Sequence, residues 1–165
     1  MPTVANLILG SSISPSGVGL GFMTGGNELT GAIHELFDEV QPSEAVAGST
    51  EYRIILIYNN HPSESFVGLK AYLSSNTTSP STTLEIGKDP NTTLGTIPKI
   101  ATETTAPAGV TFSAPSSVAG ALALGDLAPT TTGAVIGLWL KRIVTAGAAP
   151  LASDLAMLVI TNATS

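Results

Sequence analysis

The chain contains no cysteine among its 165 residues. Disulfide bonds and thiolate metal sites are therefore excluded, and cysteine usage leaves the redox compartment open. Charged side chains are also scarce, at 11% of the residues against about 25% in an average globular domain. Small neutral residues take their places and suit extended structure and close contact with neighbouring subunits. The shortage of charge indicates assembly, since a free monomer usually carries more charge for solubility.

Basic residues are few and scattered along the chain. The net charge is −6, and only Lys141 and Arg142 are adjacent. No basic stripe exists that could neutralise a row of phosphates, so we expect no nucleic-acid partner. No apolar run approaches the roughly twenty residues of a membrane-spanning helix, so we expect no membrane partner either. Residues 1–27 carry no charge, and the positively charged start of a secretory signal is therefore missing.

Two segments, residues 51–59 and 134–144, are rich in β-branched and aromatic residues on both alternating faces. A strand that is apolar on both sides must be covered on both sides. We therefore expect these two strands to be neighbours at the centre of a packed structure.

Shorter candidate strands surround this pair, with turn signals every eight to twelve residues. They lie at residues 1–9, 66–73, 82–86, 97–101, 109–113, 121–124 and 155–160. This pattern predicts an all-β protein, an antiparallel β-sandwich of immunoglobulin-like or jelly-roll topology, two alternatives that the sequence does not separate. We expect two parts: an extended N-terminal arm at residues 1–31 and a β-sandwich domain at residues 32–165.

The N-terminal arm is rich in glycine and serine and cannot build a core of its own. Its isolated apolar residues are unusual for a flexible linker, so we expect the arm to lie on its own domain or on a neighbouring subunit. A disordered N-terminus is the alternative. The residues expected to make the subunit or capsid contact are Val4, Leu7, Ile8, Val18, Leu20, Phe22 and Met23.

Residues 32–40 have apolar side chains at helical spacing, which predicts a short amphipathic helix, with a strand as the alternative. Residues 41–48 are expected to form a loop.

Groups that could perform chemistry are rare in this chain. Only His34 and His61 could serve as a base, and His61 lies in an Asn-His-Pro turn. His34 and Asp38 have the i, i+4 spacing of two metal ligands on a helix, but two ligands do not make a site. The carboxylates around Asp38 and Glu39 are expected to be solvated. We therefore predict no catalytic residue, no metal and no cofactor, hence no enzyme.

Two further features have structural interpretations. The run Gly17-Val-Gly-Leu-Gly21 lacks the spacing and the lysine of a phosphate-binding loop, so we assign it to the arm. Trp139, the single tryptophan, lies on a central strand and is expected in the core or at a subunit contact, rather than on a sugar-binding platform.

Two blocks resemble virion structural proteins of tailed bacteriophages. The first block contains Leu36-Phe-Asp-Glu-Val40, Glu44-Ala-Val-Ala-Gly48 and Glu51-Tyr-Arg53. The second contains Gly125-Asp-Leu-Ala-Pro129, Leu138-Trp-Leu-Lys-Arg142 and Ala146-Gly-Ala148. Together they frame residues 36–161 and leave the arm outside.

The resemblance implies a virion β-sandwich protein without catalytic residues. We expect a capsid decoration (cement) protein, made in the host cytoplasm, that binds the major capsid protein on the outer capsid surface and stabilises the head. Analogy with such proteins implies a homotrimer. The alternative is a tail or receptor-binding component that recognises a host glycan or protein through Trp139 or Tyr72.

Overall fold

The computed structural model describes residues 7–11, 36–93, 95–98, 100–129, 132–149 and 154–162. This part of the chain is mostly β-structure with one short helix. Its elements are β1 (Leu7–Ser11), α1 (Pro42–Ala47), β2 (Ser49–Asn59), β3 (Phe66–Ser75), β4 (Thr82–Lys88), β5 (Leu122–Leu127), β6 (Ile136–Val144) and β7 (Met157–Thr161).

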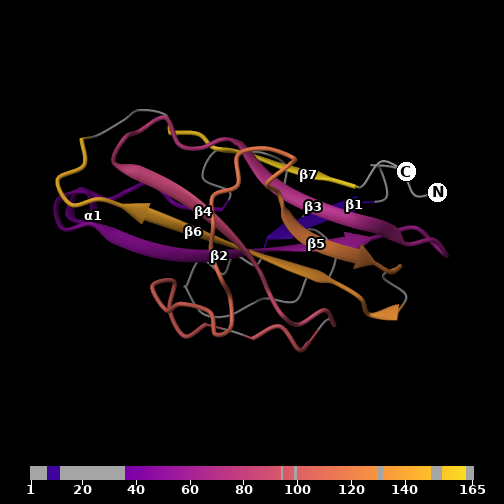
Figure 1. Cartoon of the computed structure of the whole chain (residues 1–165). Helices are drawn as coiled ribbons and strands as arrows, with labels where there is room; N and C mark the ends of the chain where they lie inside the picture. Colours follow the sequence, from indigo (N-terminus) through magenta and orange to yellow (C-terminus); the bar gives the residue numbers. More distant parts are fainter. Residues whose placement is uncertain are drawn as a thin grey trace.

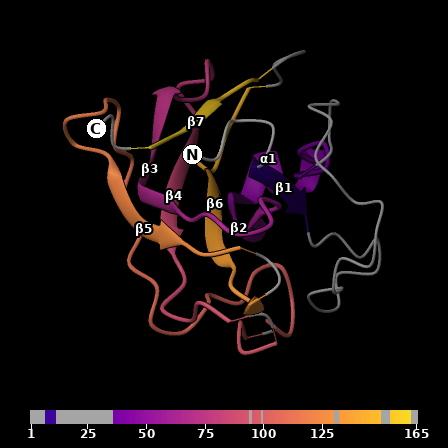
Figure 2. The same cartoon turned by 90° about the vertical axis from the view of Figure 1, so that its right-hand side faces the viewer.

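The strands form two antiparallel sheets, which are visible as two layers in Figures 1 and 2. Sheet A has the strand order β1-β2-β6-β4, and sheet B has the order β5-β3-β7. The prediction of a mostly β, antiparallel protein is confirmed.

The two strands predicted to be central, β2 and β6, are direct neighbours in sheet A. Their register places Ile54 opposite Trp139 and Ile57 opposite Ile136. Nearly every side chain in the middle of both strands is buried. The requirement that a doubly apolar strand be covered on both faces is met in two different ways.

The inner face of sheet A packs against sheet B. Side chains such as Ile57 and Leu138 from sheet A share one core with Leu69, Leu73 and Leu124 from sheet B. Burial of such side chains contributes about 1.5–3 kcal/mol each relative to exposure, so this shared core is what holds the two sheets together.

The outer face of sheet A is covered by the connection between β4 and β5, residues 89–121. Most of this cover segment lies below β2 and β6 in the view of Figure 1. Its last part runs upward to β5 and passes β3, where the N–H of Leu73 donates to the carbonyl of Pro115. A second apolar cluster forms on the outer face of sheet A, in which Ile54, Leu56 and Trp139 of the sheet meet Ile97 and Phe112 of the cover segment. The strands expected at residues 97–101 and 109–113 are absent from the described residues, and only Ser113 forms a bridge, to Ile86. Irregular backbone is enough to cover a sheet face when its apolar side chains reach the sheet.

The helix lies later in the sequence than predicted. Residues 36–40, the described part of the segment expected to be a helix or a strand, are irregular, and residues expected to form a loop make α1. The start of α1 explains the error. Pro42 suits the first helical turn, and Glu44 accepts a 2.7 Å hydrogen bond from the backbone N–H of Gln41. Gly48 ends the helix with a φ of 79°.

Part of the predicted arm belongs to sheet A. Leu7–Ser11 pairs antiparallel with β2, Leu7 opposite Asn59 and Ser11 opposite Ile55. Leu7 and Leu9 pack against the shared core. This portion of the arm therefore lies on its own domain. The other predicted contact residues, Val4, Val18, Leu20, Phe22 and Met23, lie outside the described residues.

Candidate interaction surface

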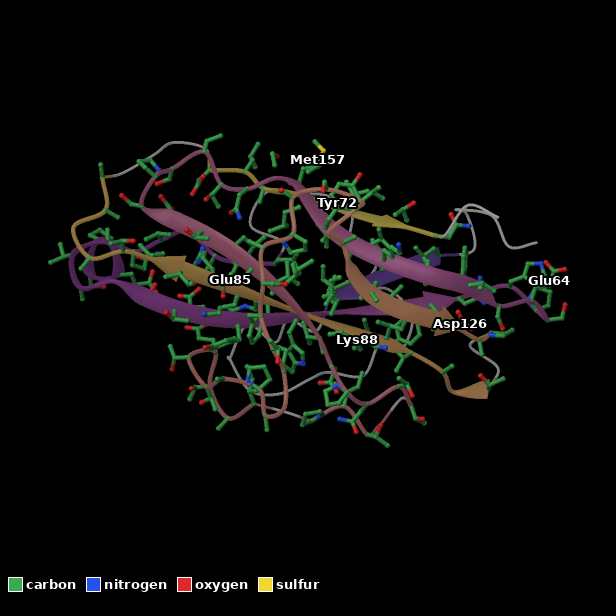
Figure 3. The ribbon with its side chains drawn as sticks, viewed as in Figure 1. Glu64, Tyr72, Glu85, Lys88, Asp126 and Met157 are labelled. Atoms are coloured by element: carbon green, nitrogen blue, oxygen red, sulfur yellow. The ribbon has the colours of Figure 1, made fainter. Side chains whose placement is uncertain are left out.

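Within the described residues, sheet B is covered on one face only, in contrast to sheet A. Alternate side chains of β3 and β7 point away from the shared core, and we call this surface the outer face of sheet B. It comprises Val67, Lys70, Tyr72, Met157 and Val159. The register sets Tyr72 opposite Val159, and Met157 is 60% exposed. Figure 3 labels Tyr72 and Met157 on this outer side.

A β-bulge shapes the β5 side of this face. The pairing of β3 with β5 shifts register between Phe66 and Lys70, and Gly68 has a φ of 63°. The backbone N–H of Gly68 donates a 2.9 Å hydrogen bond to Asp126 Oδ1. The bulge therefore fixes the position of Val67 on the surface, and Asp126 closes this edge with a charge.

An ionic cluster occupies the α1 end of the inner face of sheet A. Arg142 and Glu51 are directly opposite on β6 and β2, and Arg142 Nη2 lies 2.5 Å from Glu51 Oε2. Arg53 Nη2 lies 2.5 Å from Glu103 Oε2. The ring of Phe37 lies 4.9 Å from the Arg142 guanidinium and 5.5 Å from that of Arg53. The sequence analysis did not predict this cluster. Its only signal in the sequence is the presence of charged residues at the ends of two apolar strands.

This cluster ties the segment before α1 onto the sheet. Arg53 Nε donates a 3.0 Å hydrogen bond to the carbonyl of Leu36, and Arg142 Nη1 donates a 2.6 Å bond to that of Asp38. The two guanidinium groups thus replace the backbone partners that an irregular segment lacks. The geometry indicates a structural role for the cluster.

Glu51 is 1% exposed, and burial raises the pKa of Glu51 to about 7. The nearby Glu44 carboxyl raises this pKa further, whereas Arg142 opposes the rise. Because the unfolded chain releases this proton near pH 4.5, the folded protein holds more protons between pH 4.5 and pH 7. The contribution of Glu51 to stability is therefore greatest below this window and decreases as the pH rises through it.

The wild-type protein should lose free energy of unfolding as the pH rises from about 5 to about 7.5. We expect this loss to be smaller in the Glu51→Gln variant. The side chain no longer loses a proton, so up to about 3 kcal/mol of pH-dependent free energy of unfolding should disappear. Urea unfolding at the two pH values measures the difference. Glu39→Gln is the control, since Glu39 is exposed and should leave the pH dependence unchanged. Identical pH dependence in the wild type and in Glu51→Gln would contradict the assignment.

The described candidates for chemistry are not gathered at one site. His61 lies in the turn after β2, as predicted, where its Nδ1 accepts a 2.9 Å hydrogen bond from the backbone N–H of Glu64. Asp38 belongs to the ionic cluster, because its carbonyl and its carboxylate both contact Arg142. The prediction that this carboxylate is solvated is therefore only partly correct. His34 and the run at 17–21 lie outside the described residues. In the described part of the chain, no group of three His, Asp or Glu could hold a metal ion.

Trp139 is in the core, as predicted, with 1% of its surface exposed. Its Nε1 donates a 2.7 Å hydrogen bond to Oδ2 of Asp89, the first residue of the cover segment. The indole is therefore not available to stack on a sugar. Of the two aromatic residues expected to serve a glycan-binding component, only Tyr72 lies on a surface.

No protein-family model, curated protein or solved structure matches this chain. Within the described residues, no helix is long and apolar enough to cross a membrane.

Proposed function

We propose that this chain is a non-enzymatic structural protein of a tailed-phage virion, a decoration protein that binds the outer capsid surface and stabilises the head. The observation that carries the proposal is the contrast between the sheets. Sheet A is covered on both faces, whereas no described segment covers the outer face of sheet B, which carries one charged side chain, Lys70. A rigid block with one largely apolar, sparsely charged face suits broad contact with a protein lattice.

We further propose that the two sheets form a β-sandwich, because they share a core between them. An immunoglobulin domain joins strands 1-2-5-4 in one sheet and 3, 6 and 7 in the other. In the observed orders, 1-2-6-4 and 5-3-7, the sixth strand takes the place of the fifth in the first sheet, and the third strand, not the sixth, is central in the second. The immunoglobulin-like alternative therefore does not describe this order, and a jelly roll has eight strands, one more than the described residues form.

The proposed partner is the major capsid protein, and the proposed location is the capsid surface, after synthesis in the host cytoplasm. The resemblance to virion proteins implies a homotrimer at threefold positions. The N-terminal arm would add a strand to a neighbouring subunit, where backbone hydrogen bonds supply affinity without a pocket. Because Leu7–Ser11 pairs with β2, we restrict this role to the arm beyond β1, which contains Val18, Leu20, Phe22 and Met23.

We expect replacement of Val18, Leu20, Phe22 and Met23 by serine to weaken binding to phage heads that lack the protein by roughly tenfold or more, since about 1.4 kcal/mol corresponds to each factor of ten. Co-sedimentation with heads measures the occupancy. Removing residues 1–26 as a block is a poorer test, because it would also remove β1 from sheet A.

The matched control replaces Ser12, Ser14 and Ser16 by alanine, which changes the same arm and leaves its apolar residues in place. Normal occupancy is expected for this control. If the four-residue variant also saturates the heads at wild-type concentrations, the role of the arm is contradicted.

The second candidate is a tail or receptor-binding component, and Tyr72 on the outer face of sheet B favours it. An aromatic ring on an exposed sheet can stack on a glycan of the host surface. Antibody labelling of virions, followed by electron microscopy, separates the two candidates. Label over the head supports the decoration protein, and label confined to the tail overturns it.

A further inference from the structure

Among the described residues, strand β7 is an edge of sheet B, and part of its backbone points away from the sheet. Leu73 lies opposite Leu158, but the N–H of Leu73 donates to the carbonyl of Pro115, on the other side of β3. In an antiparallel pair, opposite residues point their backbone groups either toward each other or away from each other. The backbone groups of Leu158, and by alternation those of Ile160, therefore point away from β3. No described strand pairs with this side of β7.

Two of the other three sheet edges carry features that discourage pairing. On β4, the Asn76 side chain makes hydrogen bonds with both the N–H and the carbonyl of Leu84. The next outward residue, Ile86, exchanges two backbone bonds with Ser113. Edge β5 carries Asp126 and pairs through the bulge. Natural edges are commonly protected by charge, bulges or covering segments, and the described structure shows these devices on β4 and β5.

Edge β7 differs from β4 and β5 because the described residues place neither a charge nor a covering segment along its outward side. Residues 155–162 contain no charged side chain, and Leu155 and Met157 are both exposed. Two copies of this chain, each with a net charge of −6, repel each other. A contact between two copies is therefore favourable only where the surface in contact is uncharged. Edge β7 meets that requirement, since residues 155–162 are uncharged.

We propose that β7 pairs antiparallel with β7 of a second copy of this chain, joining two sheets B into one continuous sheet. A two-fold axis at Val159 places Leu158 of each copy opposite Ile160 of the other, so the free backbone groups satisfy one another. Met157, Val159 and Tyr72 of both copies then form one apolar surface. The two Lys70 side chains stay more than about 14 Å apart, because their strands are separated by three strand spacings and are also offset along the strand direction. This separation exceeds the screening distance of about 8 Å.

This inference concerns the protein in solution and does not depend on the proposed function. A strand that pairs with itself creates a two-fold contact, so the expected species is a dimer rather than the trimer implied by the resemblance. The chain would still be free to bind a capsid through its arm.

The absence of cysteine makes a direct test possible. In the proposed dimer, Val159 faces its own copy in a pair without backbone hydrogen bonds, where the Cα atoms lie about 4.5 Å apart. This distance suits a disulfide. Val159→Cys should therefore oxidise to a covalent dimer at micromolar concentration. Val46→Cys is the matched control, since Val46 is 75% exposed on α1, and should cross-link at least tenfold more slowly.

A second variant tests the same contact without cross-linking. Val159→Lys places two ammonium groups against each other and should convert the dimer to a monomer in sedimentation equilibrium, whereas Val46→Lys should stay dimeric. Circular dichroism and thermal unfolding of each variant establish that it is folded. A wild-type monomer or trimer, or equal cross-linking of the two cysteine variants, would overturn the proposal.

Discussion

Asp89→Ala is expected to lower the free energy of unfolding by about 4 kcal/mol, the largest effect that we predict for a single substitution. Asp89 is fully buried and accepts hydrogen bonds from the indole of Trp139, at 2.7 Å, and from the backbone and side chain of Asn91. Alanine leaves the buried indole N–H and the half-buried donors of Asn91 without this acceptor. A buried, unsatisfied donor costs about 1–3 kcal/mol. Because Trp139 is the single tryptophan, its fluorescence during urea unfolding reports directly on this site.

Asp89→Asn separates the hydrogen bonds from the packing. Asparagine has nearly the same shape, but its carbonyl oxygen can accept from only one side while its amide group faces the donor on the other. We therefore expect a loss of about 2 kcal/mol, between those of the wild type and alanine. An alanine variant within 1 kcal/mol of the wild type would show that the donors find other partners, and would contradict the structural role of Asp89.

Gly87→Ala is expected to lower the free energy of unfolding by about 3 kcal/mol. Gly87 lies on β4 with its open side against the cover segment. A Cβ at this position would lie 2.5 Å from Cγ1 of Val110 and 2.7 Å from the carbonyl oxygen of Thr111. Overpacking of this kind typically costs about 1–3 kcal/mol, and the upper end applies because a backbone atom must move. Thermal unfolding should show a decrease in the melting temperature of roughly 8 °C.

Gly120→Ala is the matched control within the same cover segment. No atom lies within 4 Å of the Cβ position at Gly120, so alanine should change the stability by less than about 0.5 kcal/mol. Equal effects of the two substitutions would show that the close approach at Gly87 is relieved without cost. A large effect at Gly87 alone would identify the packing of the cover segment on sheet A as a main source of stability.

The central strands could be predicted because their pattern admits few solutions. Two segments that are apolar on both faces must be covered on both faces, and β2 and β6 are indeed neighbours in the middle of sheet A. Strands β3, β4, β5 and β7 could be found near their observed positions because turn residues separate them. The helix was misplaced, because the apolar spacing of residues 32–40 competes with the weaker start signal at Pro42 and Glu44, and spacing alone does not decide between them.

The candidate surface was less accessible to sequence reasoning. The doubly apolar strand around Trp139 predicted its burial, but the alternation of residues 66–73 does not say which of the two faces of that strand, and so whether Tyr72, is exposed. The ionic cluster brings Glu103 to Arg53, fifty residues apart in the sequence. Pairings of this kind depend on the path of loops, which no local pattern records.

The sequence by itself determined that the chain is mostly β-structure and which two strands lie at its centre, because alternation and side-chain type act locally along a strand. Only the tertiary structure decided which strands are neighbours and which face of each strand is buried. An irregular segment covers one face of sheet A, and among the described residues the outer face of sheet B stays uncovered and β7 is an edge without charge. These outcomes depend on strand order and on contacts between distant residues. The sequence of a single strand is compatible with many such arrangements and does not select one of them.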